Sequence, residues 1–329
     1  ITDGGVTYNV TGIDAAAFRS SGLTSITIPD SVTTIGDFAF AYNDSLESIT
    51  VEQGNVNYKT IDNVLFNFSG TELIQYPVAD SRVEYTIPDT VVSVLGRSFG
   101  ISSTISSLTK VNFPSNLQTI GSFAFRYSQI DIFDFSRTQL TTIGQSAFYY
   151  CPKLTSINLS GTQVTTINST TFYFCSSLTS ITIPDSVTTI GSYAFRSCSS
   201  LTSIDLSETQ VTTIGEAAFY YCTSLTSIDL GNSVTTIGYA AFARTGLTSI
   251  TIPDSVTTID EYAFQSCSSL TSITILDSVT TIGYAAMAWC SGLTSIDLGN
   301  SVTTIGSYAF YKCTSLTSIT IPDSVTTIG

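Results

Sequence analysis

The stretch that decides the fold is "SLTSITIPDSVTTIG", which occupies Ser315 to Gly329 and also occurs letter for letter at Ser177 to Gly191. The interior copy runs on into "SYAF", and an aromatic or Met residue recurs at the end of each such unit. These anchors are Phe18, Phe40, Phe99, Phe125, Phe148, Phe172, Phe195, Phe219, Phe242, Phe264, Met287 and Phe310. From Phe125 onward they are 22 to 24 residues apart, a period that indicates a repeat architecture.

Each repeat predicts two short strands and a tight turn. In the unit Leu201–Phe219, the side chains of Ile204, Asp205 and Leu206 alternate between apolar and polar, as a half-buried strand requires. A second strand-like piece covers residues 211–215, and "AAF" closes the unit. One unit cannot bury its inward row alone, whereas stacked units bury Leu on Leu, Ile on Ile and Phe on Phe.

The whole chain, residues 1–329, is therefore predicted to be a single solenoid of about 13 coils, each 22 to 24 residues long. Short parallel strands would stack along the rod. A Gly follows the second strand in most units, and Asp14, Asn168 and Asp260 replace it in three. Asn and Asp tolerate left-handed backbone angles better than other residues with a side chain, so we expect a positive φ at this column.

The pattern L-x-x-I-x-I/L, joined to "IPDSVTTIGxxAF", resembles the BspA-like, or Treponema-type, leucine-rich repeat family. The segment Asn57–Val91, "NYKTIDNVLFNFSGTELIQYPVADSRVEYTIPDTV", is similar to that family's insertion. The resemblance implies a leucine-rich repeat solenoid with a small β insertion near the N-terminal third, over residues 51–91. It also implies an extracellular or cell-surface protein, often an adhesive one.

Composition argues against several classes of function. The net charge of −14, with no basic run, disfavours nucleic acid and anionic membranes as partners, and no apolar run is long enough for a membrane span. The chain has no histidine, so Ser/His/Asp and Cys/His sites cannot form. Asp205 and Asp229 are adjacent in the outward strand column, where solvated carboxylates or a weak cation site are alternatives to catalysis. We expect a non-enzyme without cofactor or metal.

Seven cysteines recur at the repeat spacing and predict a buried structural ladder of small side chains: Cys151, Cys175, Cys198, Cys222, Cys267, Cys290 and Cys313. Each lies three residues before the next strand Leu. Counted in the same way, the three shorter connections have Ser20, Tyr127 and Arg244 at this position. Disulfides between adjacent coils are the alternative, but parallel Cβ vectors and the odd number of cysteines count against them. Zinc would need convergent ligands such as CxxC pairs, and the sequence has none.

Hydroxyl side chains dominate the surface, because the chain has 53 Thr and 49 Ser while only 11% of its residues are charged. Thr is a good strand former that stays soluble, and it is also an acceptor for O-linked sugar. The candidates for glycosylation are Thr188, Thr189, Thr212, Thr213, Thr235, Thr236, Thr303 and Thr304, with N-linked sequons at Asn9, Asn67, Asn158 and Asn168.

Uncapped half coils are predicted at residues 1–18 and 315–329. They would expose an end-to-end interface made of Val6, Val10, Ile13, Leu316, Ile319, Ile321, Val325 and Ile328. The first hypothesis is that copies of the chain stack head to tail into a cell-surface or secreted filament, so that the partner is the protein itself.

The alternative hypothesis is a cell-surface adhesin or ligand-binding leucine-rich repeat module, with glycans or other surface proteins as partners. The outward strand columns lack the aromatic and Arg residues that dominate binding hot spots. Such residues gather around the turns instead, at Tyr149, Tyr150, Arg196, Tyr220, Tyr221 and Tyr311. The edge formed by these turns would then be the contact surface.

Overall fold

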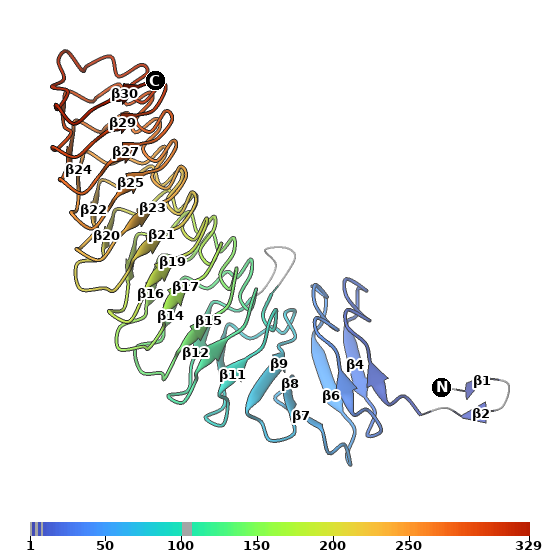
Figure 1. Ribbon diagram of the computed structural model, residues 1–329. Helices are drawn as coiled ribbons and strands as arrows, with labels where there is room; N and C mark the ends of the chain where they lie inside the picture. Colours follow the sequence, from blue (N-terminus) through green and yellow to red (C-terminus); the bar gives the residue numbers. More distant parts are fainter. Residues whose placement is uncertain (1, 4–5, 8, 101–106) are drawn as a thin grey trace. The chain divides into compact units, whose positions relative to one another are not determined.

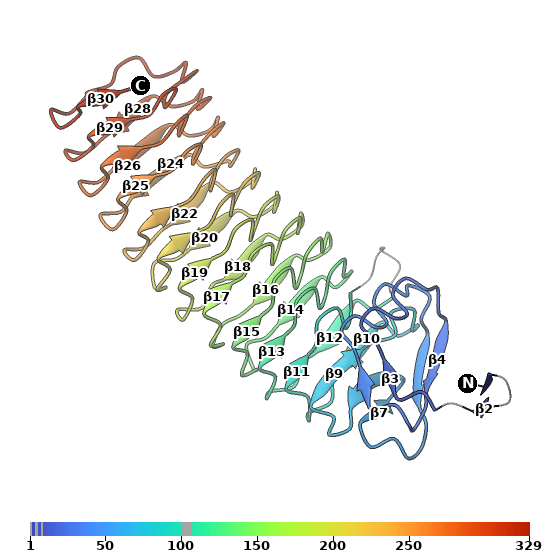
Figure 2. The same ribbon diagram turned by 45° about the vertical axis from the view of Figure 1, so that its right-hand side comes forward.

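The computed structural model describes residues 2–3, 6–7, 9–100 and 107–329, with side chains from residue 9 onward. The chain folds as an all-strand solenoid of about 14 turns with short parallel strands stacked on one another. The predicted fold class is confirmed, with one turn more than the sequence suggested. The chain divides into two compact units, Ile1–Cys151 and Pro152–Gly329. Figures 1 and 2 show the strands of both units, coloured along the sequence.

The strands of unit 1 are β1 (Thr2–Asp3), β2 (Val6–Thr7), β3 (Gly12–Ile13), β4 (Ser25–Ile28), β5 (Thr34–Ile35), β6 (Ser48–Val51), β7 (Tyr58–Ile61), β8 (Val64–Asn67), β9 (Glu72–Gln75), β10 (Glu84–Thr86), β11 (Ser93–Val94), β12 (Lys110–Asn112), β13 (Thr119–Ile120), β14 (Ile132–Asp134) and β15 (Thr142–Ile143). Those of unit 2 are β16 (Ser156–Asn158), β17 (Thr166–Ile167), β18 (Ser180–Thr182), β19 (Thr189–Ile190), β20 (Ser203–Asp205), β21 (Thr213–Ile214), β22 (Ser227–Asp229), β23 (Thr236–Ile237), β24 (Ser249–Ile252), β25 (Thr258–Ile259), β26 (Ser272–Ile275), β27 (Thr281–Ile282), β28 (Ser295–Asp297), β29 (Thr304–Ile305) and β30 (Thr327–Ile328). The described part of the chain contains no helix with the length and hydropathy that a membrane span needs.

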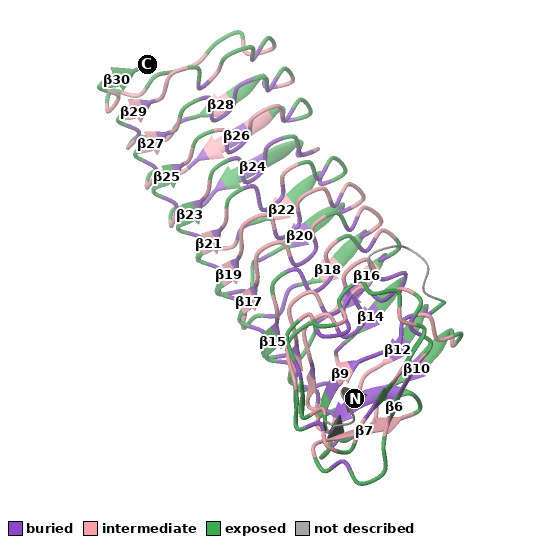
Figure 3. Cartoon of the chain, turned by 90° about the vertical axis from the view of Figure 1, so that its right-hand side faces the viewer, coloured by how far each residue is buried: buried purple, intermediate pink, exposed green. Residues whose placement is uncertain are grey.

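Each coil of unit 2 up to β29 contributes one strand to each of two rows, and the last coil contributes β30 alone. The second strands form one continuous parallel sheet from β17 to β30, in which identical positions pair, such as Ile190 with Ile214. The first strands pair in register in shorter parallel sheets, β16 with β18, β20 with β22, and β26 with β24 and β28, so that Ile204 lies beside Ile228. Buried residues recur at equivalent positions of successive coils, as the colouring of Figure 3 shows. Because every coil repeats the same apolar positions, stacking places each inward side chain on its own equivalent.

The anchor aromatics form a stack through the core of unit 2. The rings of Phe195 and Phe219 lie 5.2 Å apart and those of Phe219 and Phe242 lie 5.4 Å apart, with interplanar angles of 2° and 3°. All three side chains are fully buried. The Phe-on-Phe packing expected from the repeat is confirmed.

The turns that carry the anchors alternate in backbone conformation. Tyr193 and Ser197 have φ angles of 59° and 63°, although neither is a glycine. The N–H groups of Tyr193, Phe195 and Ser197 donate to carbonyls of the next coil, at 2.8 Å in each case, while those of Ala194 and Arg196 close local turns. These two sets of hydrogen bonds pair the backbone N–H groups of the turn and connect adjacent coils. Their free energy offsets the conformational cost of the residues with positive φ.

The prediction of a positive φ at the glycine column is wrong. None of the column glycines has a positive φ, and the positive-φ glycines of the described chain lie elsewhere. The column needs glycine because adjacent coils approach closely there. A Cβ at Gly191 would lie 2.7 Å from the backbone nitrogen of Ser169, and one at Gly215 would lie 2.6 Å from that of Ser192.

Replacing a column glycine should therefore destabilise the protein for steric reasons. We expect Gly215→Ala to lower the free energy of unfolding by about 2 to 4 kcal/mol, since backbone atoms of the preceding coil must move. Gly22→Ala is the control: Gly22 has a φ of +73° but nothing within 4 Å of the added Cβ, so only a conformational cost of about 1 kcal/mol is expected. Urea unfolding of both variants measures the difference, and equal losses would contradict the steric account.

The insertion of unit 1 is a small antiparallel meander. β7 pairs with β8 and β8 with β9, and β9 then joins the solenoid sheet in parallel with β11. The Tyr58 hydroxyl, at the start of the meander, accepts a hydrogen bond from the N–H of Ile35 at 2.8 Å. At the beginning of the chain, β2 pairs antiparallel with β1, so the segment around Val6 does not form the parallel strand of a regular coil.

Candidate binding surface

The cysteines form a buried column that links successive coils. Cys198 Sγ donates to the carbonyl of Phe172 at 3.1 Å and Cys222 Sγ to that of Phe195 at 3.0 Å. The equivalent bond is made by Cys151, Cys267, Cys290 and Cys313, and Cys175 is buried as well. All seven thiols are free, so the structural alternative describes this column and the disulfide alternative does not.

The shorter connections fill this column with a residue other than the one expected. The column lies three residues after the anchor, so the shorter connections place Ser21, Ser128 and Thr245 in it, while Asn43 fills it in a connection of full length. Ser21 Oγ donates to the Phe18 carbonyl at 2.8 Å, and Thr245 Oγ1 to the Phe242 carbonyl at 2.9 Å. The residues predicted at this position, Ser20, Tyr127 and Arg244, instead adopt positive φ angles of 55°, 62° and 60°. That prediction was wrong because the residue that the shorter connections lack is missing between the column and the next strand, and not between the anchor and the column.

The burial of the thiols predicts that they are unreactive in the folded protein. Burial raises the pKa of Cys222 to about 12, so almost no thiolate forms there at pH 8. We expect Ellman's reagent at pH 8 to modify none of the seven cysteines before unfolding and all seven in denaturant. Rapid labelling of native protein, or fewer than seven thiols after unfolding without reductant, would contradict the free, buried column.

The threonine pairs form ladders of hydrogen bonds between coils. Thr188 Oγ1 donates to the carbonyl of Thr165 at 3.1 Å, and Thr235 Oγ1 to that of Thr212 at the same distance. Thr303 donates to Thr280 at 3.1 Å and Thr212 to Thr188 at 3.4 Å. Their partners in each pair, Thr189, Thr213, Thr236 and Thr304, lie in β19, β21, β23 and β29. The exposed hydroxyls therefore already have a structural role.

The sequon asparagines lie in varied surroundings. Asn9 is exposed, whereas Asn67, Asn158 and Asn168 are half-buried. Asn67 Nδ2 donates to Glu72 and Thr71, and Asn158 Oδ1 accepts the N–H of Ser160 at 3.1 Å. Glycosylation at these asparagines and at the threonines stays a prediction, which an intact mass above 35.1 kDa in native material would support.

The residues predicted at the end-to-end interface lie partly in the open. Leu316, Ile319 and Val325 are half-buried, while Ile321 and Ile328 are exposed by 40% and 62%. At the other end Val10 is half-buried and Ile13 buried, and the side chain of Val6 lies outside the described residues. The last coil of any solenoid exposes its inward row in this way. The exposure of these side chains therefore does not favour stacking of copies of the chain over their burial by a different molecule or segment.

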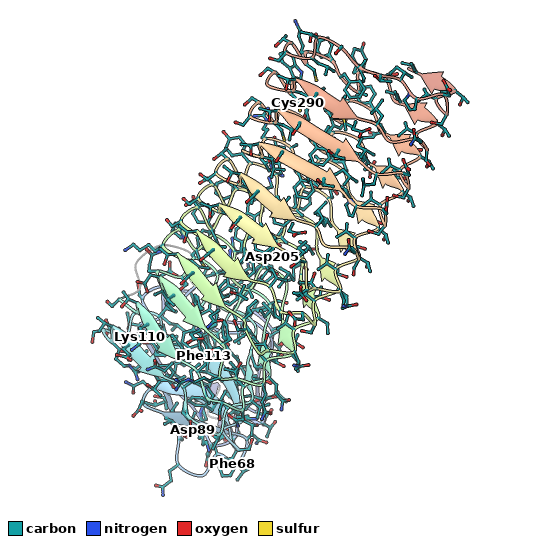
Figure 4. All side chains as sticks on the ribbon, turned by 90° about the vertical axis from the view of Figure 1, so that its left-hand side faces the viewer. Phe68, Asp89, Lys110, Phe113, Asp205 and Cys290 are labelled. Carbon is teal, nitrogen blue, oxygen red and sulfur yellow. The ribbon has the colours of Figure 1, made fainter. Side chains whose placement is uncertain are left out.

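The outward strand carboxylates act as turn caps. Asp205 Oδ1 accepts the N–H of Ser207 at 2.9 Å, and this hydrogen bond lowers the pKa of Asp205 (labelled in Figure 4). Asp229 and Asp297 accept the N–H groups of Gly231 and Gly299 in the same manner. Among the described residues, no group of His, Cys, Asp and Glu is arranged to hold a metal ion.

The turn edge of unit 2, meaning the segments from the glycine column to two residues past each anchor, carries a continuous row of aromatic rings. Tyr239, Tyr262, Tyr284 and Tyr308 follow one another through four coils at centroid distances of 5.3, 5.3 and 5.6 Å. Tyr311 and Trp289 extend the row through contacts of 5.5 and 5.6 Å. Every contact is edge-to-face, the favourable geometry for aromatic pairs. We call these six residues the aromatic row.

The aromatic row is open to solvent and carries a positive charge at one end. Trp289 and Tyr308 are exposed by 50% and 57%. The Lys312 ammonium lies 5.9 Å from the Trp289 ring centroid and 5.7 Å from that of Tyr311. An isolated exposed aromatic needs no explanation, whereas a contiguous exposed patch of this kind marks an interaction surface.

A second aromatic group lies further back along the same edge. A cavity of about 330 Å³ is lined by Phe174, Arg196, Tyr220 and Tyr221 with three serines. The Arg196 guanidinium lies 4.8 Å from the Tyr220 ring centroid. The predicted contact residues Arg196, Tyr220 and Tyr221 are thus brought together, while Tyr311 belongs to the aromatic row and Tyr149 and Tyr150 lie in unit 1.

The contact residues predicted from the sequence do not include Trp289 or the four tyrosines Tyr239, Tyr262, Tyr284 and Tyr308 of the aromatic row. Tyr239 and Tyr284 stand one residue after the column glycine, while Tyr262 and Tyr308 stand two after the column residue. A column-by-column alignment separates the two positions, although the folded turn brings all four rings into one row. A search for aromatics anywhere between the column residue and the anchor would have found them.

Comparison with known proteins agrees with this architecture. The BspA type leucine rich repeat region matches residues 5–85, 79–163, 141–270 and 236–329. None of the curated proteins compared with the chain is significantly similar to it.

Several solved structures are similar. A leucine-rich repeat protein from Eubacterium ventriosum is 31% identical with a TM-score of 0.66, over 72% of this chain and 63% of that one, so this chain spans less than two thirds of that relative. One from Bacteroides ovatus is 28% identical with a TM-score of 0.66, over 100% and 81% of the two chains. A leucine rich cell surface protein from Faecalibacterium prausnitzii is 25% identical with a TM-score of 0.52, over 90% and 85%. Because the family match extends over nearly the whole sequence, the chain belongs to the BspA-type leucine-rich repeat family.

Proposed function

We propose that the chain is a non-enzymatic binding module of a cell-surface protein and that it contacts a partner protein through the turn edge of unit 2. The cell-surface location is supported by the Faecalibacterium prausnitzii relative, which is described as a cell surface protein. The family consists of leucine-rich repeats that typically bind without catalysis. The proposal therefore follows the adhesin alternative and not the filament hypothesis.

The observation that carries the proposal is the aromatic row. Tyr and Trp are enriched at binding hot spots because they bury a large area at a small cost in conformational entropy. Six such rings in contact, with Lys312 beside them, provide both apolar area and hydrogen-bonding groups on one edge. The Thr and Asp side chains of the outward strand face are bound to backbone groups or are small, so that face offers no comparable anchor.

The experiment is a selection from a phage-displayed library of random 12-residue peptides against the purified full chain. Trp289 is the single tryptophan and lies in the aromatic row, so its fluorescence reports directly on that surface. We expect enriched peptides to change the emission of Trp289 in a saturable way. Peptides that bind the chain without any change in this emission would count against the aromatic row. If no peptide were enriched and the chain bound selected glycans on an array, the proposal of a protein partner would be overturned.

A further inference from the structure

Three arginines of unit 1 gather around one tyrosine ring. The guanidinium carbons of Arg19, Arg97 and Arg126 lie 5.1, 5.2 and 5.5 Å from the ring centroid of Tyr42. Phe123 lies beside two of them, at 4.9 Å from Arg97 and 6.0 Å from Arg126. We call the three arginines and Tyr42 the arginine cluster. It brings together three of only 11 basic residues in a chain of net charge −14.

No acidic side chain among the described residues forms an ion pair with the cluster. In the part of the chain that the structure describes, the ion pairs are Arg82–Asp80 and Lys110–Glu84, and neither involves the cluster. Arg126 donates to the hydroxyls of Tyr42 and Tyr127, which are neutral acceptors. Aromatic faces therefore stand where carboxylates usually balance buried guanidinium groups.

Hydrogen-bonding capacity is also left unused. The Nε and Nη1 atoms of Arg97 and the Nε atom of Arg126 are buried without a hydrogen-bond partner. Burial lowers the pKa of Arg97, and the positive charges of Arg19 and Arg126 lower it further against an opposing effect of Tyr42. Like charges held together with unsatisfied donors cost free energy, which an added anion would recover.

We propose that the arginine cluster binds a tetrahedral oxoanion, the sulfate or phosphate group of a small ligand. Arginine suits this chemistry because its planar fork of N–H donors matches the oxygens of such groups. Arg19 is exposed and gives the anion an approach from solvent, while Arg97 and Arg126 are half-buried. The net charge of −14 repels long polyanions, so one isolated anionic group fits better than a nucleic acid or a highly sulfated polymer.

The test uses the full chain with inorganic phosphate and inorganic sulfate as probes, each against chloride at matched ionic strength. Binding to the native state raises the Tm, and a tenfold excess over Kd should raise it by about 2 °C in a saturable way. Equal rises in Tm with both probes would show that the cluster recognises tetrahedral oxoanions in general. A rise in Tm with one probe alone would show whether the ligand carries a phosphate or a sulfate group. No response beyond chloride to either probe would overturn the proposal.

Variants assign the response to the cluster. Arg19→Gln changes an exposed side chain, so it should fold normally and weaken binding of the effective anion at least about tenfold, as loss of a charged hydrogen bond implies. The matched control is Arg244→Gln, an exposed arginine 6.0 Å from the Tyr221 ring in unit 2, which should keep the full response. An unchanged response in Arg19→Gln would place the anion elsewhere. Variants of the aromatic row should leave the response intact, which separates this inference from the proposed function.

Discussion

Phe219→Ala is expected to lower the free energy of unfolding by about 3 to 5 kcal/mol, the usual cost of truncating a fully buried phenylalanine. Phe219 is in contact with the rings of Phe195 and Phe242 on either side. Its removal leaves a cavity that neither neighbour can fill, because both rings are held by the backbone bonds of their own turns. The deletion also interrupts the stack in the middle of unit 2.

Urea unfolding followed by circular dichroism measures this effect, with Tyr221→Ala as the matched control. Tyr221 belongs to the same turn but is exposed by 45%, so its truncation should cost no more than about 1 kcal/mol. Because a solenoid can lose cooperativity at a weakened coil, we also expect a broader transition for Phe219→Ala. If the two variants unfolded at the same urea concentration, the anchor stack could not be the principal source of stability.

Simultaneous replacement of Trp289 and Tyr311 by Ser is expected to weaken binding of a selected peptide by about 30-fold or more. Loss of a hot-spot residue costs about 2 kcal/mol or more, and about 1.4 kcal/mol corresponds to tenfold in Kd. Both side chains are about half exposed, at 50% and 43%, and contact each other at the end of the aromatic row. Their removal should therefore change the stability little while it removes one end of the contact surface.

Biolayer interferometry with the immobilised peptide gives the two dissociation constants. Phe68→Ser is the control, since Phe68 is equally exposed, at 53%, but lies in unit 1 (Figure 4). It should bind like the wild type. Equal affinities for the wild type and the double variant would remove these two rings from the binding surface.

The periodicity of the sequence was enough to predict the strands and the core. Every inward position repeats in each coil, so Ile204, Phe219 and their equivalents could be placed without knowledge of the turn geometry. The structure has about 14 turns where about 13 were predicted. The sequence of the meander, residues 58–75, lacks the repeat pattern, but its last strand, β9, pairs with β11 in the solenoid sheet.

Features that depend on contacts between coils could not be obtained in the same way. A glycine column is compatible with either a positive φ or a close approach, and only the distance from Gly215 to Ser192 decides between them. The column that contains the cysteines lies at a fixed spacing from the anchor and not from the next strand. An alignment based on the strands therefore separates Cys222 from Thr245, although both side chains donate to the carbonyl of an anchor residue.

The candidate site was predicted only in part. Arg196, Tyr220 and Tyr221 were expected on the turn edge, where the structure places them around one cavity. The aromatic row depends on alternate turn positions meeting in space, and the arginine cluster unites Arg19 with Arg126 across more than a hundred residues. Neither arrangement follows from the repeat, because both lie at its variable positions.

The most direct test of the central claim is hydroxyl-radical footprinting of the chain with and without a saturating selected peptide. Oxidation of Trp289, Tyr308 and Tyr311 should fall several-fold on binding, while that of exposed Phe68 in unit 1 stays constant. Such a result would place the partner on the turn edge of unit 2. Unchanged oxidation of all three residues in the bound state would contradict the account.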